Sequence, residues 1–271
     1  FLVTYQGSIY QGGLCVDEEV KERWNRAAAH YQATVREENG GYPDRLMEFL
    51  WDAGALRPGC YVADIGCGAG KYAIRFAGLG CGLLLLDIAD HMMAYTKENL
   101  ASAGVSAEFA VCDWAEVGLA ARGWEKSVDL AFASMTPAVE TRADLQKLSA
   151  MSRGFCFVSK FVEMDNLLCR QAAKLCGAAP PDVRAREDPL ALLRWLLEDG
   201  YLPAVRFDPY GWENVYSPRE AEAALRESEW GAALPAGRLR EALVALAGAD
   251  GMVRETVRAK TMWLLWDVSK K

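Results

Sequence analysis

Histidine is scarce in this 271-residue sequence, which contains only His30 and His91. A metal centre built from several imidazoles is therefore excluded. The eight cysteines form no Cys-x-x-Cys pair, so we interpret them as reduced thiols rather than as zinc ligands or disulfides. We expect no metal ion in this protein.

The sequence also lacks a sustained run of lysine and arginine, and its formal net charge is −7. A nucleic-acid partner usually requires a basic surface, so we expect none. The longest apolar run, residues 79–86, is too short to cross a bilayer, so we expect no membrane partner either. The first residues lack the basic start and cleavage pattern of a signal peptide, and we expect a cytoplasmic location.

A glycine-rich segment follows a short apolar run that ends in Asp64. Gly66, Gly68 and Gly70 stand at alternate positions, and a helical pattern begins at Lys71. This order predicts a strand, a tight turn and a helix whose first N–H groups can bind a polar ligand. A dinucleotide fingerprint has the longer spacing G-x-G-x-x-G, which these glycines do not match.

The pattern Asp-x-Gly-x-Gly-x-Gly resembles motif I of the class I S-adenosylmethionine-dependent methyltransferases. The resemblance implies S-adenosyl-L-methionine as the cofactor. It also implies that the turn lies beneath the methionine and ribose parts of the cofactor, and it assigns the following residues to binding: Asp64, Gly66, Cys67, Gly68 and Gly70.

Acidic residues also follow the next two predicted strands. Asp87 ends the apolar strand at 81–86, and its carboxylate can accept hydrogen bonds from both ribose hydroxyls. An acid at this place also occurs in enzymes that use NAD, so it indicates a nucleoside without separating the two families. The resemblance implies that Ile88 and Met92 cover one face of adenine.

The ends of the third and fourth strands complete the resemblance. The resemblance assigns Cys112, Asp113 and Trp114 to cofactor binding. Asp113 is expected to accept a hydrogen bond from the adenine amino group, and Trp114 either flanks the ring or is a core aromatic. Ala133 and Ser134 are expected to face the transferable methyl group. The sequence Ser-Met-Thr-Pro at 134–137 differs from the Asn/Asp-Pro-Pro-Tyr form of enzymes that methylate amino groups of bases and glutamine.

An amphipathic helix is predicted from Asp17 onward, with Trp24 and Tyr31 on its apolar face. It resembles the lid that many small-molecule methyltransferases fold over the cofactor, and Tyr31 would then contact the cofactor. Alternatively, both aromatic side chains simply pack the helix against the body.

The resemblance implies an α/β fold, a Rossmann-like seven-stranded sheet of order 3-2-1-4-5-7-6 whose last strand is antiparallel, and crossover chirality favours this winding. We expect one domain over 1–271, with an N-terminal helical lid at 1–57, a cofactor-binding core at 58–162, and the C-terminal half of the sheet at 163–271. Gly154 is predicted to end a helix before a fifth strand at 155–161. Strand six is predicted at 201–208 and strand seven at 261–268.

Residues 209–259 would then be a helical insertion that contains a capping box, Ser217 to Glu220. The insertion carries the aromatic residues Tyr210, Trp212, Tyr216 and Trp230. It either caps the substrate pocket or makes the contact of a homodimer.

The function implied by the resemblance is methyl transfer from S-adenosylmethionine to a small-molecule acceptor by in-line displacement. The sequence identifies no catalytic residue. Two alternatives stay open: an NAD(P)-dependent oxidoreductase, and a protein of the same fold that binds S-adenosylmethionine without catalysis.

Overall fold

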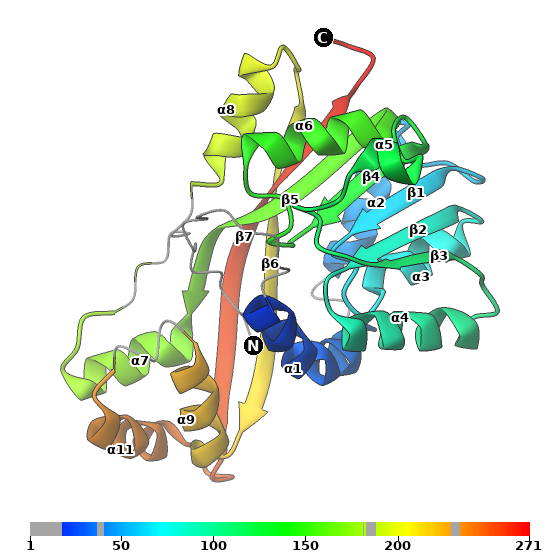
Figure 1. Cartoon of the computed structure of the whole chain (residues 1–271). Coiled ribbons are helices and arrows are strands. Elements are labelled where there is room, and N and C mark those ends of the chain that lie inside the picture. Colours follow the sequence, from blue (N-terminus) through cyan, green and yellow to red (C-terminus); the bar gives the residue numbers. More distant parts are fainter. Residues whose placement is uncertain (1–17, 37–40, 181, 183–187, 229–233) are drawn as a thin grey trace. The chain divides into compact units, whose positions relative to one another are not determined.

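The computed structural model describes residues 18–36, 41–180, 182, 188–228 and 234–271 (Figure 1). The expected helix cap Asp17 and the insertion residue Trp230 lie outside these residues. In chain order the elements are α1 (Glu18–Thr34), α2 (Tyr42–Asp52), β1 (Tyr61–Ile65), α3 (Lys71–Gly78), β2 (Gly82–Asp87), α4 (Asp90–Ser102), β3 (Glu108–Val111), α5 (Leu119–Arg122), β4 (Val128–Ser134), α6 (Arg142–Met151), β5 (Ser152–Asn166), α7 (Leu167–Cys176), α8 (Leu190–Glu198), β6 (Ala204–Tyr216), α9 (Pro218–Glu227), α11 (Ala236–Leu246) and β7 (Val253–Asp267).

The strands form one seven-stranded sheet in the order β3-β2-β1-β4-β5-β7-β6. The pairs β1–β2, β1–β4, β2–β3 and β4–β5 are parallel. β7 runs antiparallel to β5 and β6 (Figure 1). The predicted Rossmann-like strand order and the antiparallel last strand are therefore confirmed.

The chain divides into two compact units, and the expected domain organisation stays a prediction. The main unit contains the described residues within 11–160, 188–207 and 262–271. The small unit contains the described residues within 161–187 and 208–261. The division falls within β5, β6 and β7, each of which has residues in both units.

Aromatic side chains form the core of the main unit. Phe132 of β4 stacks on Phe157 of β5 with ring centroids 5.0 Å apart, and Tyr72 and Phe76 of α3 contact the same ring of Phe132. Trp263 of β7 is fully buried, and its indole N–H donates to a tyrosine hydroxyl of α2 at 2.8 Å. These rings attach α2 and α3 to one face of the sheet.

The other face of the main unit's sheet is covered by α6. Trp266 is three residues after Trp263 and therefore points to the opposite face. Its indole N–H donates to Ser149 Oγ at 3.0 Å, and both side chains are buried. Because the indole N–H groups of Trp263 and Trp266 both have partners, these two side chains can be buried without an unsatisfied donor.

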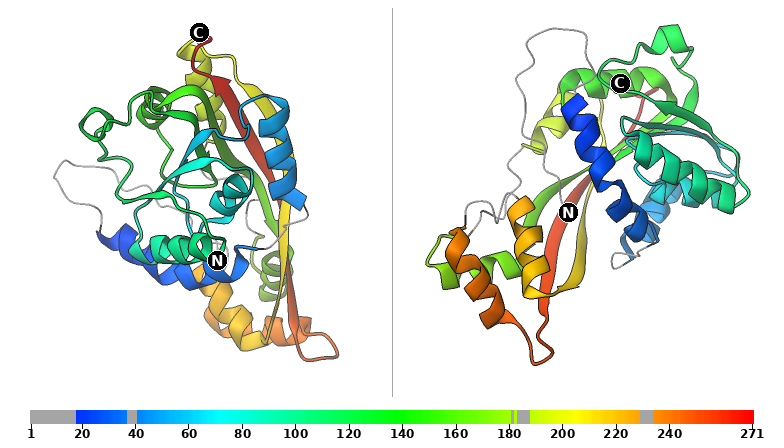
Figure 2. Two further views of the ribbon diagram at one scale, coloured as in Figure 1. Left: turned by 90° about the vertical axis from the view of Figure 1, so that its right-hand side faces the viewer. Right: turned by 60° about the horizontal axis from the view of Figure 1, so that its bottom comes forward.

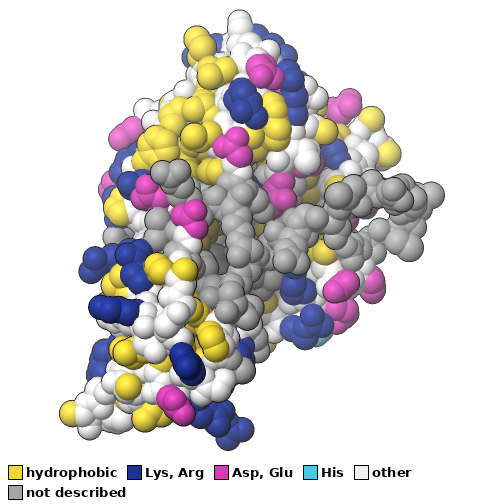
Figure 3. All heavy atoms as spheres, turned by 90° about the vertical axis from the view of Figure 1, so that its left-hand side faces the viewer, with side chains coloured by type: hydrophobic (Ala, Val, Ile, Leu, Met, Phe, Trp, Pro, Cys, Tyr) yellow, Lys and Arg dark blue, Asp and Glu magenta, His cyan; other side chains and the backbone are white. Residues whose placement is uncertain are grey.

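The helix α8 buries only one side. Leu192 and Leu196 are buried, whereas Leu190 and Leu197 are about half exposed at 52% and 51%. Figure 3 shows the side of the molecule that carries α8, with hydrophobic side chains gathered near the top.

No helix among the described residues is long and apolar enough to cross a membrane.

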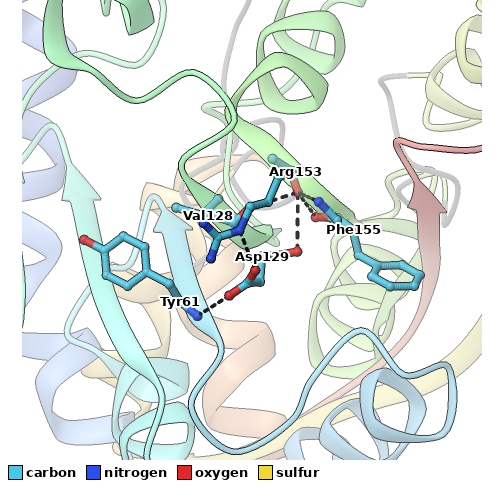
Figure 4. A network of polar contacts seen from close by, with 7 residues as sticks. Tyr61, Val128, Asp129, Arg153 and Phe155 are labelled. Atoms are coloured by element: carbon cyan, nitrogen blue, oxygen red, sulfur yellow. Dashed lines mark hydrogen bonds and ion pairs between the residues drawn. The ribbon is translucent and has the colours of Figure 1, made fainter.

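A bulge lies at the start of β5, where Gly154 was predicted to end a helix, and Figure 4 shows the polar contacts of Asp129 and Arg153 at this place. That prediction is wrong, because Gly154 belongs to the strand. A Cβ on Gly154 would lie 2.6 Å from the backbone oxygen of Asp129, so the glycine permits close approach of two backbones. The Asp129 carboxylate accepts from Tyr61 N at 2.8 Å and from Arg153 Nε at 2.7 Å, which fixes the register.

The small unit has its own hydrophobic core. Three helices, α7, α9 and α11, lie side by side (Figure 2) and bury Leu168, Ala221, Leu225, Leu239 and Leu243. The predicted capping box that begins α9 is confirmed, since the side chains and backbone N–H groups of Ser217 and Glu220 bond reciprocally.

The segment that connects β6 to β7 is residues 217–252, and the predicted insertion 209–259 is too long at both ends. Pro209 and Gly211 in β6 are typical of turns, but the missing Cβ of Gly211 lets its backbone approach Val257 O of β7. Asn166 and Asn214 each donate to the buried carboxylate of Glu255, at 2.6 and 2.8 Å. This polar network across β5, β6 and β7 is invisible to a search for apolar runs.

Candidate functional site

The carboxyl ends of the parallel strands bring the predicted site residues to one edge of the sheet. Asp64 of β1 is in register with Leu85 of β2, and Asp87 at the end of β2 is in register with Val111 of β3. Neighbouring strands lie about 4.8 Å apart, so Asp64 and Asp87 are close neighbours. Ser134 ends β4 at the same edge.

The turn between β1 and α3 is fixed by hydrogen bonds from several elements. Gly66 N and Cys67 N both donate to Leu86 O, at 2.8 and 3.0 Å. Thr96 Oγ1 of α4 donates to Gly68 O at 2.6 Å, and Asn99 Nδ2 donates to the next carbonyl at 2.9 Å. Sequence reasoning missed Thr96 and Asn99, although polar residues three apart on a buried helix face are a detectable signal.

The three glycines of the turn have different roles. A Cβ on Gly66 would lie 2.1 Å from Thr136 Oγ1, and a Cβ on Gly70 would lie 3.2 Å from Thr96. A Cβ on Gly68 would meet no atom within 4 Å. Gly66 and Gly70 therefore make room for protein side chains, whereas Gly68 leaves space where a ligand can approach the backbone.

Asp87 is 8% exposed, and its carboxylate fixes the glycine turn through hydrogen bonds. Its Oδ2 accepts from Gly68 N at 2.9 Å, and its Oδ1 accepts from Ala89 N at 2.9 Å. Each carboxylate oxygen keeps a second lone pair that can accept a ligand hydroxyl. Burial raises the pKa of Asp87 to about 6, although the backbone hydrogen bonds act in the opposite direction.

Asp64 is 2% exposed, and its Oδ2 has no hydrogen-bond partner among the described residues. Burial raises its pKa to about 8, and the nearby charge of Asp87 contributes in the same direction. A buried carboxyl oxygen without a partner is costly and indicates that a ligand or water completes the site.

The helix α1 packs over this edge on α4. Trp24 and Tyr31 of α1 pack with Ile88 and Met92 around buried Ala28, and the Trp24 and Tyr31 rings lie 6.0 Å apart. Burial raises the pKa of Tyr31 to about 12, and the charge of Asp87 adds to the rise. The structure thus brings Tyr31, Ile88 and Met92 together near Asp87, and their contact with the cofactor stays a prediction.

Two polar contacts fix the position of α1. Asn25 Oδ1 accepts from His91 N at 3.0 Å and so satisfies an N–H group in the first turn of α4. Lys21 Nζ lies 2.6 Å from Asp90 Oδ2. Packing of the helix against the body is therefore observed, and its role as a lid stays a prediction.

The residues after β3 lie beside Asp87. Cys112 N donates to Asp87 O, and the Asp113 carboxylate accepts from Ala115 N at 2.9 Å, which holds it in a local turn. Trp114 is 3% exposed, with the Lys147 ammonium 5.3 Å from its ring centroid. Its Nε1 has no partner among the described residues. Stacking of Trp114 on adenine stays a prediction.

The residues after β4 lie against β5. Ala133 is fully buried, and Ser134 Oγ forms a hydrogen bond with Ser159 Oγ at 2.9 Å. Met135 follows with a φ of 50°, one of two non-glycine residues with positive φ among the described residues. No three His, Cys, Asp or Glu side chains within the described ranges gather to hold a metal ion.

Residues 62–153 match the family model described as a methyltransferase domain. This range begins in β1, ends in β5 and contains the glycine turn, Asp87, Asp113 and Ser134. The chain contains a class I methyltransferase domain. The family that the sequence resembles is thus confirmed, and with it an enzyme of the methyltransferase class.

Solved structures share the fold of this methyltransferase. A protein of Bacillus halodurans C-125 assigned as a methyltransferase is 12% identical with a TM-score of 0.51, and 82% of this chain and 97% of that chain are covered. A protein of Galdieria sulphuraria assigned as a sarcosine dimethylglycine methyltransferase is 15% identical with a TM-score of 0.51, and 85% of each chain is covered.

A third similar structure is magnesium protoporphyrin IX methyltransferase from Synechocystis PCC 6803 with bound SAH. It is 20% identical with a TM-score of 0.47, and 74% of this chain and 84% of that chain are covered. A comparison with curated protein sequences finds no significant match.

Proposed function

We propose that this methyltransferase transfers the methyl group of S-adenosyl-L-methionine to a small-molecule acceptor by in-line displacement. The open space at Gly68, whose N–H donates to the buried carboxylate of Asp87, carries the proposal together with the buried carboxyl of Asp64. Two acids in a low-dielectric site favour a positively charged ligand that also carries hydroxyl groups. When bound, S-adenosylmethionine supplies an electrophilic methyl group on a sulfonium and two ribose hydroxyls.

The residues around Gly68 fit this cofactor. Asp87 would accept the ribose hydroxyl hydrogens with its remaining lone pairs, and Asp64 would lie near positive charge on the methionine part. Ile88 and Met92 would cover adenine, while Asp113 would accept from its amino group. The enzyme's part is mainly to orient the acceptor and exclude water, because the sulfonium is already activated.

The acceptor is proposed to be a small molecule with an apolar part. The net charge of −7 without a basic run disfavours nucleic acid. The small unit carries a ring cluster in which Tyr210 lies 5.5 Å from Phe161 and 5.8 Å from Trp212, centroid to centroid. Such half-buried rings offer an apolar surface to a ligand.

Calorimetry with S-adenosylmethionine, S-adenosylhomocysteine and NAD tests the cofactor. We expect heat of binding with the first two and none with NAD. Binding of NAD alone would favour the oxidoreductase. Binding without any transfer in a screen of metabolites, transfer RNA and proteins would favour the non-catalytic alternative, and faster transfer to RNA or protein would refute the small-molecule acceptor.

The cysteines within the described ranges are free thiols, which supports the proposed cytoplasmic location, since reducing compartments keep thiols unpaired. A homodimer stays a prediction, and sedimentation of the purified chain would test it.

A further inference from the structure

We propose that Lys160 is a positioning residue that fixes the turn Ser134–Met135–Thr136 against the glycine turn of the cofactor site. The inference rests on the proposed function, because its consequence is the position of Met135 relative to the glycine turn at which S-adenosylmethionine is proposed to bind. All of these residues belong to the main unit.

Met135 adopts a backbone conformation that costs free energy. Its φ is 50°, which is the left-handed region that side chains other than glycine, asparagine and aspartate rarely occupy. Such a residue persists only where its surroundings hold it, and these positions concentrate at functional sites. The contacts that hold Met135 are therefore the contacts that shape this part of the site.

Two consecutive residues of β5 hold the turn. Ser159 accepts from Met135 N with its backbone oxygen at 3.0 Å and with its Oγ at 3.2 Å. Lys160 Nζ donates to Thr136 O at 2.8 Å and lies 3.7 Å from a carboxylate oxygen of Glu140. The Lys160 side chain is only 13% exposed, so the ammonium bonds the carbonyl in a setting with little competing water.

The same turn contacts the cofactor site directly. Thr136 is 7% exposed, and its Oγ1 occupies the space that a Cβ on Gly66 would need. Because Thr136 is fixed on one side by Lys160 and packs on the other side against Gly66, the two turns cannot shift independently. Lys160 thereby sets the position of Met135 relative to the glycine turn.

Lys126, at the opposite end of β4, provides a matched control for the substitution of Lys160. It also has a φ of 50°, and its Nζ donates to a backbone oxygen, Ser149 O, at 3.0 Å. It precedes β4, whereas Met135 follows it. Removal of either ammonium deletes one lysine–carbonyl bond, but only Lys160 touches the turn after β4.

The experiment records methyl NMR spectra of the full chain labelled with [methyl-13C]methionine, with and without S-adenosylmethionine. The Met135 signal is assigned as the one missing from Met135→Leu. In the unchanged protein we expect this signal to shift on addition of S-adenosylmethionine. In Lys160→Leu we expect the signal to move toward the random-coil position and the ligand-induced shift to be lost, while affinity by calorimetry stays within about threefold. Lys160→Arg should restore the signal position and the ligand-induced shift. Lys126→Leu should leave these two readouts unchanged.

An unchanged Met135 signal and ligand shift in Lys160→Leu would overturn the inference, and so would equal effects of Lys160→Leu and Lys126→Leu. If Lys160→Leu does not fold, Lys160→Gln gives the same test, because its side chain is one atom shorter than that of lysine and carries no charge. Failure of the unchanged protein to bind S-adenosylmethionine would refute the proposed function itself. Binding with an unmoved Met135 signal in the variant would refute only the role of Lys160.

Discussion

The Thr136 hydroxyl oxygen lies 2.1 Å from the point where a Cβ on Gly66 would stand. Gly66 also has a φ of 70°, so an alanine there would meet both a steric clash and an unfavourable backbone conformation. We expect Gly66→Ala to destabilise the fold by about 2–5 kcal/mol, the sum of a left-handed residue and an overpacked contact.

Gly68→Ala is the matched control for Gly66→Ala, because its φ is also positive but its Cβ would meet no atom within 4 Å. We expect urea unfolding to show a free energy of unfolding that is only about 1–2 kcal/mol lower, because the backbone conformation alone is unfavourable for alanine. Thr136→Gly should partly rescue Gly66→Ala. Equal losses for the two alanine variants would show that the contact with Thr136 is unimportant.

Asp87→Ala should weaken the binding of S-adenosylmethionine by about 1–3 kcal/mol, because the ribose hydroxyls would lose their acceptor. Calorimetry on the folded variant measures this change. Asp129→Ala is the control, since Asp129 also accepts from a backbone N–H but lies at the other end of its strand. Unchanged affinity in Asp87→Ala would exclude Asp87 from the cofactor site.

The raised pKa of Asp64 predicts a pH dependence of stability. Its pKa is about 8 in the folded protein and about 4 in an unfolded chain, so between these values the folded state binds more protons. Stability should therefore fall as pH rises from about 4 to about 8 and then level off. Asp64→Asn should remove this part of the pH dependence and raise the free energy of unfolding by at least about 1 kcal/mol at pH 8.

Binding of a sulfonium should act on Asp64 in the opposite sense, because a nearby positive charge favours the ionised carboxyl. Binding should then release protons, and affinity should rise with pH up to about 8 in the unchanged protein. Calorimetry in buffers of different ionisation enthalpy counts the released protons. A pH-independent affinity would show that the cofactor does not lie near Asp64.

The helix α1 is predicted to respond to the cofactor. Because Trp24 and Tyr31 pack with Ile88 and Met92, ligand bound at adenine should slow amide hydrogen exchange across residues 24–31. The helix α7, which belongs to the small unit, serves as an internal reference. Equal exchange with and without S-adenosylmethionine would mean that α1 only packs against the body and does not act as a lid.

The sheet order and the strand-end acids could be predicted because their signals are local. A continuous apolar strand such as β2 followed by Asp87 is visible in the sequence, and the parallel register then places the acids at one edge. The capping box at Ser217 and Glu220 was predictable for the same reason, since its two residues are three positions apart.

The contacts that assemble the site could not be predicted, because they join residues distant in the chain. Nothing near Gly66 in the sequence points to Thr136, and nothing near Lys160 points to the carbonyl that it binds. The extent of β6 was missed because proline and glycine normally indicate a turn. The start of β7 was missed because Glu255 is buried between Val253 and Val257 and so interrupts the alternation of apolar and polar residues in the sequence.

The small unit is predicted to serve the acceptor and not the cofactor. Residues 217–252 supply α9 and α11, which together with α7 form its hydrophobic core. The residues proposed to bind S-adenosylmethionine all lie in the main unit, between Tyr31 and Ser134. A chain in which a short linker joins Tyr216 to Val253 should therefore bind S-adenosylmethionine with unchanged affinity but lose methyl transfer to the acceptor that the metabolite screen identifies.

Removal of residues 217–252 also exposes the apolar face of α7, so general unfolding must be separated from loss of an acceptor surface. Leu239→Ala in α11 is the control, because it leaves a cavity at a fully buried position and costs about 2–5 kcal/mol without removing the segment. Calorimetry and turnover are measured on both variants. Full acceptor turnover in the shortened chain would refute a role for the segment, and loss of S-adenosylmethionine binding would show that the main unit depends on the small one.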